Sequence, residues 1–153
     1  ALRYSLVMGD AFNDFSVPYH LTTHEFNQLV RQHLTDDGIY MLNLIDGKER
    51  PFVGAFLRTL KQTFDYLYFI PTSDNWENLL RNTYVVLASP SPIDMNKLRQ
   101  VYGGDTLRAV DNWLVREDRM YAVMSNGNTL LTDEYVPTDH LLAPMFEASE
   151  AAK

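Results

Sequence analysis

Two aspartates stand directly after short apolar stretches that have the composition of buried strands. Asp10 follows Leu2–Met8 and a glycine, and Asp46 follows Ile39–Ile45. In an open α/β sheet, ligands bind in the crevice beyond the carboxyl ends of the strands. A carboxylate in that place can bind an ammonium group or take a proton from an attacking amine. Asp10 is therefore a candidate catalytic base, with the alternative that it only accepts hydrogen bonds from loop amides.

The loop that follows Asp10 carries further polar side chains. Asn13, Asp14 and His20 lie in or beside it, among aromatic residues that can lower the local dielectric constant. We expect all three to shape a substrate-binding site. Asp14 has the alternative role of capping the turn before Pro18. For His20 the alternative is a solvated side chain that fixes the loop.

The end of the next predicted strand offers a second set of polar groups. We expect Asp46 to contact the substrate from the neighbouring crevice. Asn43 either lines that crevice or is a buried amide that the backbone satisfies. The loop aromatics that could wall a pocket are Tyr19, Trp76 and Tyr135.

Composition narrows the class of ligand. The 153 residues include 20 acidic and 13 basic side chains, a net charge of -7, which favours cationic or neutral partners and argues against nucleic acid. Arg116 and Arg119, the nearest approach to a basic cluster, fit a solvated face. The chain has no cysteine and its four histidines lack metal-ligand spacing, so we predict no metal site. Without a bilayer-length apolar run, we expect a soluble, cytoplasmic domain.

The elements that must position these groups follow from apolar periodicity. After the first strand, a helix is predicted from Thr22, because Thr22 and Glu25 form a Thr-x-x-Glu capping box. After the second strand, a helix begins at Pro51. Two further strands are predicted at Tyr66–Ile70 and Thr83–Ala88. The order strand, helix, strand, helix, strand, strand indicates an α/β fold, the C-terminal half of a Rossmann-like, doubly wound sheet with an antiparallel terminal hairpin.

The last third of the chain has weaker patterns. Its predicted elements are, in order, a helix from Ser91 to Gly103 and Gly104, a helix over Asp105–Val115, a short strand at Met120–Met124, and an irregular tail beyond Leu131 with Glu147–Lys153 frayed. We treat residues 1–153 as a single domain or fragment. Its half-Rossmann core would occupy residues 1–90, and a helical and irregular extension residues 91–153.

Three stretches carry a resemblance to a known family. GDAFNDFSVPYHLTTHEF, LTDDGIYMLNLID and LLTDEYVPTDHLLAPM resemble the later motifs of spermidine synthase-like proteins, the polyamine aminopropyltransferases. The likeness is closest to the bacterial branch in which such a domain is joined to a transporter-like membrane portion. It implies a class I methyltransferase-type fold, and a membrane tether only through a part outside this chain.

The resemblance also implies a reaction. In the family, an aspartate in the position of Asp10 acts as base toward a small-molecule amine, and the aminopropyl group comes from decarboxylated S-adenosylmethionine. The family pattern has a second aspartate three residues on, followed by proline. This sequence has Asn13 there, and its proline comes only at Pro18. The difference argues against putrescine as the acceptor.

The family's cofactor-binding residues have no counterpart in this sequence. A glycine-rich turn and a ribose-binding acidic residue are expected upstream of Ala1, because Gly103 and Gly104 follow a predicted helix and not a strand. We therefore expect the isolated chain to bind adenosyl cofactors weakly or not at all. A half-sheet also leaves the edge of Leu2–Met8 unpaired, which predicts a homodimer or larger homo-oligomer.

Three functions remain open from the sequence. The first is aminopropyl transfer in a longer parent protein, with this fragment inactive alone. The second is a non-catalytic binding or interaction module that keeps the fold, which Asn13 favours. The third is S-adenosylmethionine-dependent methyl transfer on the same architecture.

Overall fold

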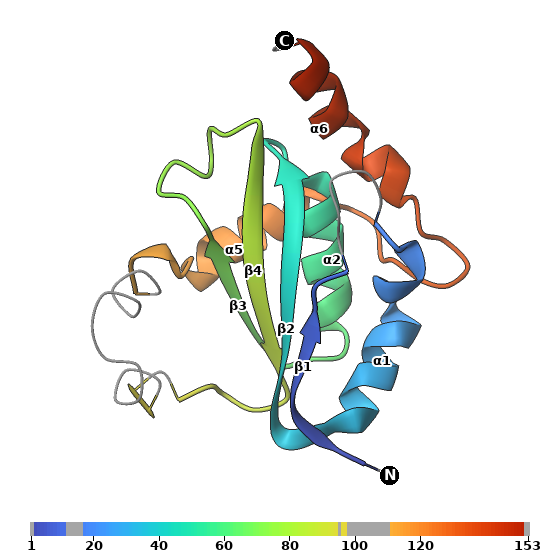
Figure 1. Cartoon of the computed structure of the whole chain (residues 1–153), viewed down its shortest axis with the longest axis vertical. Coiled ribbons are helices and arrows are strands. Elements are labelled where there is room, and N and C mark those ends of the chain that lie inside the picture. Colours follow the sequence, from blue (N-terminus) through green and yellow to red (C-terminus); the bar gives the residue numbers. More distant parts are fainter. Residues whose placement is uncertain (1, 12–16, 95, 98–110, 152–153) are drawn as a thin grey trace.

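The chain folds as a four-stranded sheet with helices packed on one face (Figure 1). The computed structural model describes residues 2–11, 17–94, 96–97 and 111–151. The elements are β1 (Tyr4–Gly9), η1 (Tyr19–Leu21), α1 (His24–His33), β2 (Leu34–Gly47), α2 (Pro51–Lys61), β3 (Tyr66–Pro71), β4 (Arg81–Ser89), α5 (Glu117–Asn126) and α6 (Thr138–Ala151).

The strand order confirms the predicted fold class. The sheet runs β1-β2-β4-β3, in which β1 and β2 are parallel and the pairs β2/β4 and β3/β4 are antiparallel. The crossover from β1 to β2 passes through α1, which is the βα unit of a doubly wound sheet, and β3 with β4 forms the terminal hairpin. The carboxyl ends of β1 and β2 therefore meet at one edge of the sheet.

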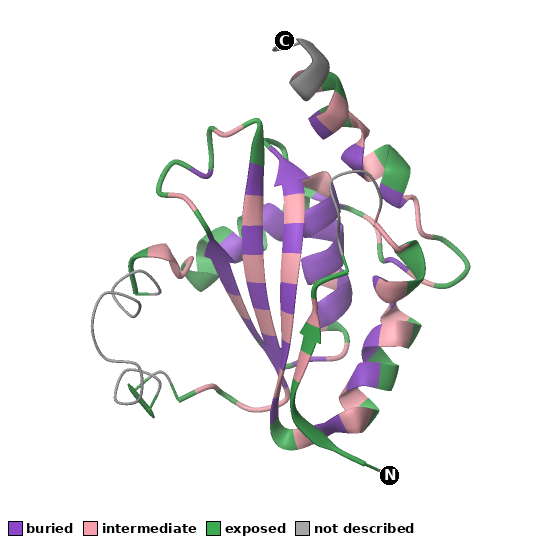
Figure 2. Cartoon of the chain, viewed as in Figure 1, coloured by how far each residue is buried: buried purple, intermediate pink, exposed green. Residues whose placement is uncertain are grey.

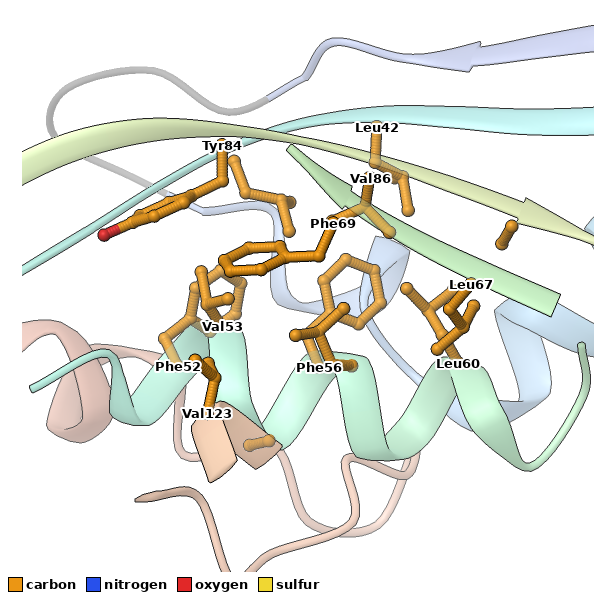
Figure 3. Close-up of a cluster of buried hydrophobic side chains, with 14 of the residues drawn as sticks. Leu42, Phe52, Val53, Phe56, Leu60, Leu67, Phe69, Tyr84, Val86 and Val123 are labelled. Atoms are coloured by element: carbon orange, nitrogen blue, oxygen red, sulfur yellow. The ribbon is translucent and has the colours of Figure 1, made fainter. Parts of the chain in front are cut away.

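The core lies between α2 and one face of the sheet. Phe52, Phe56 and Leu60 of α2 recur at helical spacing and are fully buried. Figure 3 shows them facing the side chains of the strands, among which Phe69 and Tyr84 stack with ring centroids 5.1 Å apart. Burying a large apolar side chain stabilises the fold by roughly 1.5 to 3 kcal/mol. This packing fixes α2, and with it the carboxyl end of β2.

The opposite face of the sheet is uncovered by the described helices. Figure 1 shows α2 and α5 behind the strands, and no described helix in front of them. Alternate residues of β2 and β4 are buried or half-buried (Figure 2), whereas Tyr4, Leu6 and Met8 of β1 are 49%, 48% and 62% exposed. Within the described residues, β1 pairs only with β2. The predicted self-association through this edge stays a prediction.

The beginning of α1 lies one residue later than predicted. The N-cap is Thr23, whose hydroxyl accepts a hydrogen bond from the Phe26 amide at 3.2 Å. Thr22 instead donates its hydroxyl proton to the Tyr19 carbonyl at 2.7 Å. The capping box of Thr22 and Glu25 is therefore wrong, because the 3-10 turn before the helix takes up Thr22. Glu25 is left available for another partner.

The predicted strand at Met120–Met124 is wrong, because these residues lie in α5. Met120, Val123 and Met124 have the i, i+3, i+4 spacing of one helix face, and all three are buried. Arg58 of α2 donates hydrogen bonds to the carbonyls of Met124 and Gly127 at 3.0 and 2.9 Å, which satisfies the carboxyl end of α5. The apolar run Met120–Met124 has the composition of a strand, and its packing against α2 explains why it is a helix.

The irregular tail predicted beyond Leu131 is wrong over most of its length. The segment 138–151 is the helix α6, which includes the stretch predicted to fray from Glu147 as far as Ala151. Leu142 and Met145, three residues apart, are buried against the rest of the fold. Pro144 inside the helix concealed this periodicity, since proline interrupts helices more often than it continues them.

The predicted helices between Ser91 and Val115 lie mainly outside the described residues. Residues 111–113 are helical, and the Val115 amide then donates to the Phe69 carbonyl of β3 at 2.9 Å. The second of these helices thus ends at Trp113, two residues earlier than predicted. No helix of the described residues is long and apolar enough to cross a membrane.

Candidate functional site

Asp10 directly follows β1, beside β2, which continues to Gly47. The register pairs Gly9 of β1 with Leu42 of β2, so the next residues, Asp10 and Asn43, stand side by side. The Asn43 amide Nδ2 donates a hydrogen bond to Asp10 Oδ1 at 2.9 Å. This bond orients an exposed carboxylate at the carboxyl end of β1. Asn43 is half-buried and bonds the Asp10 side chain, so it is not the buried amide satisfied by backbone that was the alternative; its lining of a crevice stays a prediction.

A hollow of about 330 Å³ opens beside this carboxylate. We call it the Asp10 hollow, and its lining residues are Val7, Met8, Gly9, Asp10, Ala11, Leu21, Phe26 and Tyr40. A Cβ added to Gly9 would come within 2.7 Å of Leu42 and 3.1 Å of the Tyr40 hydroxyl, so glycine allows the close packing beneath the hollow. Burial raises the pKa of Tyr40 above its ordinary value, which keeps this hydroxyl protonated. The hollow therefore combines one carboxylate with largely apolar walls.

A second hollow, of about 470 Å³, lies at η1 and the start of α1. We call it the Glu25 hollow, and it is lined by Tyr19, His20, Thr23, Glu25, Phe26, Leu29 and Asp133. Phe26 borders both hollows. The Asp133 amide donates to Glu25 Oε2 at 3.0 Å, which holds the chain near the C-terminus against α1.

Of the loop residues that the sequence placed in one site with Asp10, the structure describes only His20, and it lines a different hollow. His20 is exposed and lines the Glu25 hollow, where its ring lies edge-on to Tyr19 at 5.5 Å. Asn13 and Asp14 lie outside the described residues. Their predicted roles in substrate binding, like that of His20, stay predictions.

Asp46 is buried and serves the helix that follows it. Its side chain accepts hydrogen bonds from the Gly47 amide at 2.7 Å and the Val53 amide at 2.8 Å, and the residue is 1% exposed. A carboxylate that accepts backbone amides at the first turn of a helix satisfies donors that have no partner within the helix. The predicted contact of Asp46 with a substrate stays a prediction, but this geometry gives the carboxylate a structural role at α2.

The burial of Asp46 predicts a stability that depends on pH. Burial raises its pKa from 3.8 to about 7, although the amides of Val53 and Gly47 and the charge of Arg50 oppose the rise. The folded state then binds a proton that the unfolded state has released, so stability should fall as the pH rises from about 4 to about 7 and level off above. The loss attributable to Asp46 is on the order of a few kcal/mol. Urea unfolding across this pH range measures it.

The matched control is Asp46→Asn, which cannot titrate. Its overall stability will change because the amide accepts with one oxygen only, so the comparison concerns the slope of stability against pH. We expect a flatter slope in the variant. Equal slopes in both proteins would assign the pH dependence to other groups.

Sequence reasoning missed the residues that complete the two hollows. The sequence pattern places Glu25 in a helix cap, and Asp133 lies inside the C-terminal motif. Of the loop aromatics, Trp76 packs into the core against Phe69 at 5.8 Å, with the Arg50 guanidinium 4.8 Å from its ring centroid, so it does not wall either hollow. Within the described residues no cluster of histidine and acidic side chains could hold a metal ion.

Comparison with known proteins agrees with this architecture. No family model matches the chain. A stretch of 42 residues is 33% identical to a probable polyamine aminopropyl transferase of Bifidobacterium longum, over 28% of this chain and 9% of that protein.

Solved structures cover far more of the chain. A probable spermidine synthase from Corynebacterium glutamicum superposes with a TM-score of 0.67 and 18% identity, over 88% of this chain and 48% of that one. Spermidine synthase from Thermotoga maritima superposes with a TM-score of 0.55 and 14% identity, over 80% of this chain and 44% of that one. Human methyltransferase-like protein 13, in complex with SAH, superposes with a TM-score of 0.50 and 20% identity, over 91% of this chain and 56% of that one.

The chain is therefore an α/β domain of the fold that spermidine synthases share with class I methyltransferases. More particularly, it resembles spermidine synthases in fold, and one stretch of 42 residues is similar to a polyamine aminopropyl transferase. It spans about half the length of the solved spermidine synthases and 9% of the curated relative.

Proposed function

We propose that this chain forms the acceptor side of an aminopropyltransferase-type active site, with Asp10 as its base. The observation that supports this most directly is the Asp10 carboxylate, held by Asn43 at 2.9 Å at the carboxyl end of β1, beside a hollow with apolar walls. An ammonium group in the hollow would be attracted to the carboxylate and poorly solvated by its surroundings, which strengthens the attraction. The net charge of -7 favours the approach of cations.

Asp10 would act on the proton of the acceptor. Its carboxylate takes the proton from the amine nitrogen, which can then form a bond to the propyl carbon while the carbon–sulfur bond of the donor breaks and its electron pair stays on sulfur. The donor in this proposal, decarboxylated S-adenosylmethionine, supplies the aminopropyl group. Asn43 keeps the carboxylate pointed at the amine, and Tyr40 closes the wall behind it.

Methyl transfer from S-adenosylmethionine is the second candidate. The likeness to a human methyltransferase-like protein in complex with SAH favours it, because both reactions are supported by one architecture. A binding module without catalysis is the third candidate. The three candidate functions predict an aminopropylated product, a methylated product or no product, so one product assay distinguishes them.

The test uses the complete polypeptide to which this chain belongs. It is incubated with an aliphatic amine and either decarboxylated S-adenosylmethionine or S-adenosylmethionine, and the amine product is identified by mass spectrometry. We expect aminopropylated amine with the decarboxylated donor. Methylated product would support the second candidate, and binding of the amine without any product would support the third.

A further prediction concerns the isolated chain. We expect no binding of S-adenosylmethionine or its decarboxylated form at micromolar concentration, because no described strand is followed by a glycine-rich turn that opens a helix. The glycine after β1, Gly9, precedes a loop and η1. Isothermal titration calorimetry of residues 1–153 measures this. Micromolar affinity would show that the chain holds the adenosyl group without further segments.

A further inference from the structure

Asn126 and Gly127 form the only Asn–Gly pair in the sequence. Asn126 is the exposed last residue of α5, whereas Gly127 is buried. An asparagine that precedes glycine is thermolabile, because no side chain shields the following backbone nitrogen from the carbon of the asparagine amide. The pair is therefore chemically reactive, and the rate of its reaction depends on how the fold holds it.

The fold holds this pair against α2 and the turn before it. Arg58 of α2 donates a hydrogen bond from Nε to the Gly127 carbonyl at 2.9 Å. The Asn126 side chain donates from Nδ2 to the Glu49 carbonyl at 2.8 Å. A Cβ added to Gly54 would lie 2.9 Å from the Gly127 nitrogen, so the two backbones are in contact. These contacts restrain both the side-chain amide and the backbone nitrogen that would attack it.

Deamidation of this pair needs a movement that the contacts oppose. The Gly127 nitrogen must form a bond to Cγ of Asn126 while the Cγ–Nδ2 bond breaks, and ammonia leaves with the proton of the glycine nitrogen. Water then opens the succinimide ring at one of its two carbonyls, which gives aspartate or isoaspartate. Ring closure turns the peptide between the two residues, and it therefore moves a glycine whose Cβ position is already occupied by backbone atoms of α2. The end of α5 must open locally before this can happen.

We propose that Asn126 is a deamidation site that the contact between α2 and α5 protects, and that its products keep this contact from forming again. Aspartate at this position turns a carboxylate oxygen toward the Glu49 carbonyl, and two acceptors repel one another. Isoaspartate adds a carbon atom to the backbone directly before Gly127, where a Cβ would already lie 2.2 Å from the Ala55 nitrogen. A transient opening is thereby converted into a permanent loss of stability.

The rate of deamidation in native buffer and in unfolding urea tests the protection. The chain is kept at mildly alkaline pH, and the aspartate and isoaspartate forms of its digested peptides are separated and identified by mass spectrometry. We expect reaction at Asn126 in urea and a rate at least about tenfold lower in native buffer, because only locally open molecules react. Equal rates would overturn the proposal, and so would the absence of reaction in urea.

Two asparagine side chains serve as controls. Asn128 is also exposed, but Thr129 follows it, and a β-branched side chain shields its own backbone nitrogen. We expect little reaction there in either condition, and a rate equal to that of Asn126 would show that exposure alone decides the reaction. Asn126→Gln keeps an amide that can donate to the Glu49 carbonyl, while its longer side chain closes a ring slowly. Its peptide should stay unmodified.

Arg58→Ala tests whether the contact with α2 controls the rate. The variant removes the hydrogen bonds to the carbonyls of Met124 and Gly127, which measure 3.0 and 2.9 Å. We expect deamidation to rise by roughly tenfold in native buffer and to stay the same in urea, because the end of α5 opens more often. Circular dichroism shows whether the variant is folded, and Arg58→Lys, which keeps one cationic group, replaces it if it is not. An unchanged native rate in the folded variant would overturn the role of the contact.

The stability of the product tests the second half of the proposal. Deamidation adds one negative charge to a chain whose net charge is -7, so ion exchange can separate the reacted chain from the unreacted one. We expect the reacted chain to unfold at a lower urea concentration, with the isoaspartate form less stable than the aspartate form. Equal unfolding midpoints of reacted and unreacted chain would show that the products still pack against α2, and would overturn this half.

Discussion

Asp10→Asn should reduce aminopropyl transfer by the complete polypeptide by about 10² to 10⁴-fold, the usual contribution of a positioned general base. Asparagine is nearly isosteric, and its oxygen can still accept the hydrogen bond from Asn43 that now measures 2.9 Å. The side chain would keep its place but could not take a proton. The loss should therefore appear in kcat more than in the KM for the amine, as measured in steady-state kinetics with mass-spectrometric detection of the product.

The control for this variant is Asp139→Asn, which removes an exposed carboxylate of the same type from the first turn of α6. It lines neither hollow and should leave kcat unchanged. Because neutralising Asp10 also weakens attraction of the ammonium form, the assay is repeated at saturating amine. Full activity of Asp10→Asn under those conditions would exclude Asp10 as the base.

The order of elements in the first ninety residues could be predicted because local pattern and tertiary structure agree there, although β2 begins at Leu34 and ends at Gly47, beyond both ends of the predicted strand. The run Ile39–Ile45 is apolar and bounded by Asp46 and Gly47, and it lies inside β2. Pro51 opens α2 as the first-turn proline rule predicts. The start of α1 was predicted one residue too early, because either Thr22 or Thr23 could cap a helix. Since η1 takes up Thr22, the N-cap is Thr23.

The candidate site could be predicted only where it depends on strand ends. The position of Asp10 could be predicted because a polar residue that follows a parallel strand lies at the carboxyl edge of the sheet. Its role as a base stays a prediction. Asp46 fits the same rule, yet it is buried because α2 begins directly above it and takes its oxygens. The hydrogen bond between Glu25 and the Asp133 amide joins residues 108 positions apart. It depends on how the C-terminal motif packs against α1, so no local sequence pattern predicts it.

The uncovered sheet face reflects where the core lies. Met8, Met41 and Leu87 are partners in register and point to the face that the described helices leave open. The side chains of the other face are buried under α2 and α5. The folding core thus lies on one side of the sheet only, and the stability of the chain should depend heavily on the contact between α2 and α5.

Gly127→Ala should therefore destabilise the fold by about 3 kcal/mol or more, because this contact is closer than a side chain allows. A Cβ at Gly127 would lie 2.2 Å from the Ala55 amide nitrogen and 2.6 Å from the Pro51 carbonyl, both of them backbone atoms that cannot rotate away. The Gly127 φ of -113° is open to any residue, so backbone strain is not the cause. Urea unfolding measures the change, with exposed Asn128→Ala as the matched control. A loss below about 0.5 kcal/mol, the range of ordinary surface substitutions, would show that α2 and α5 can separate without cost.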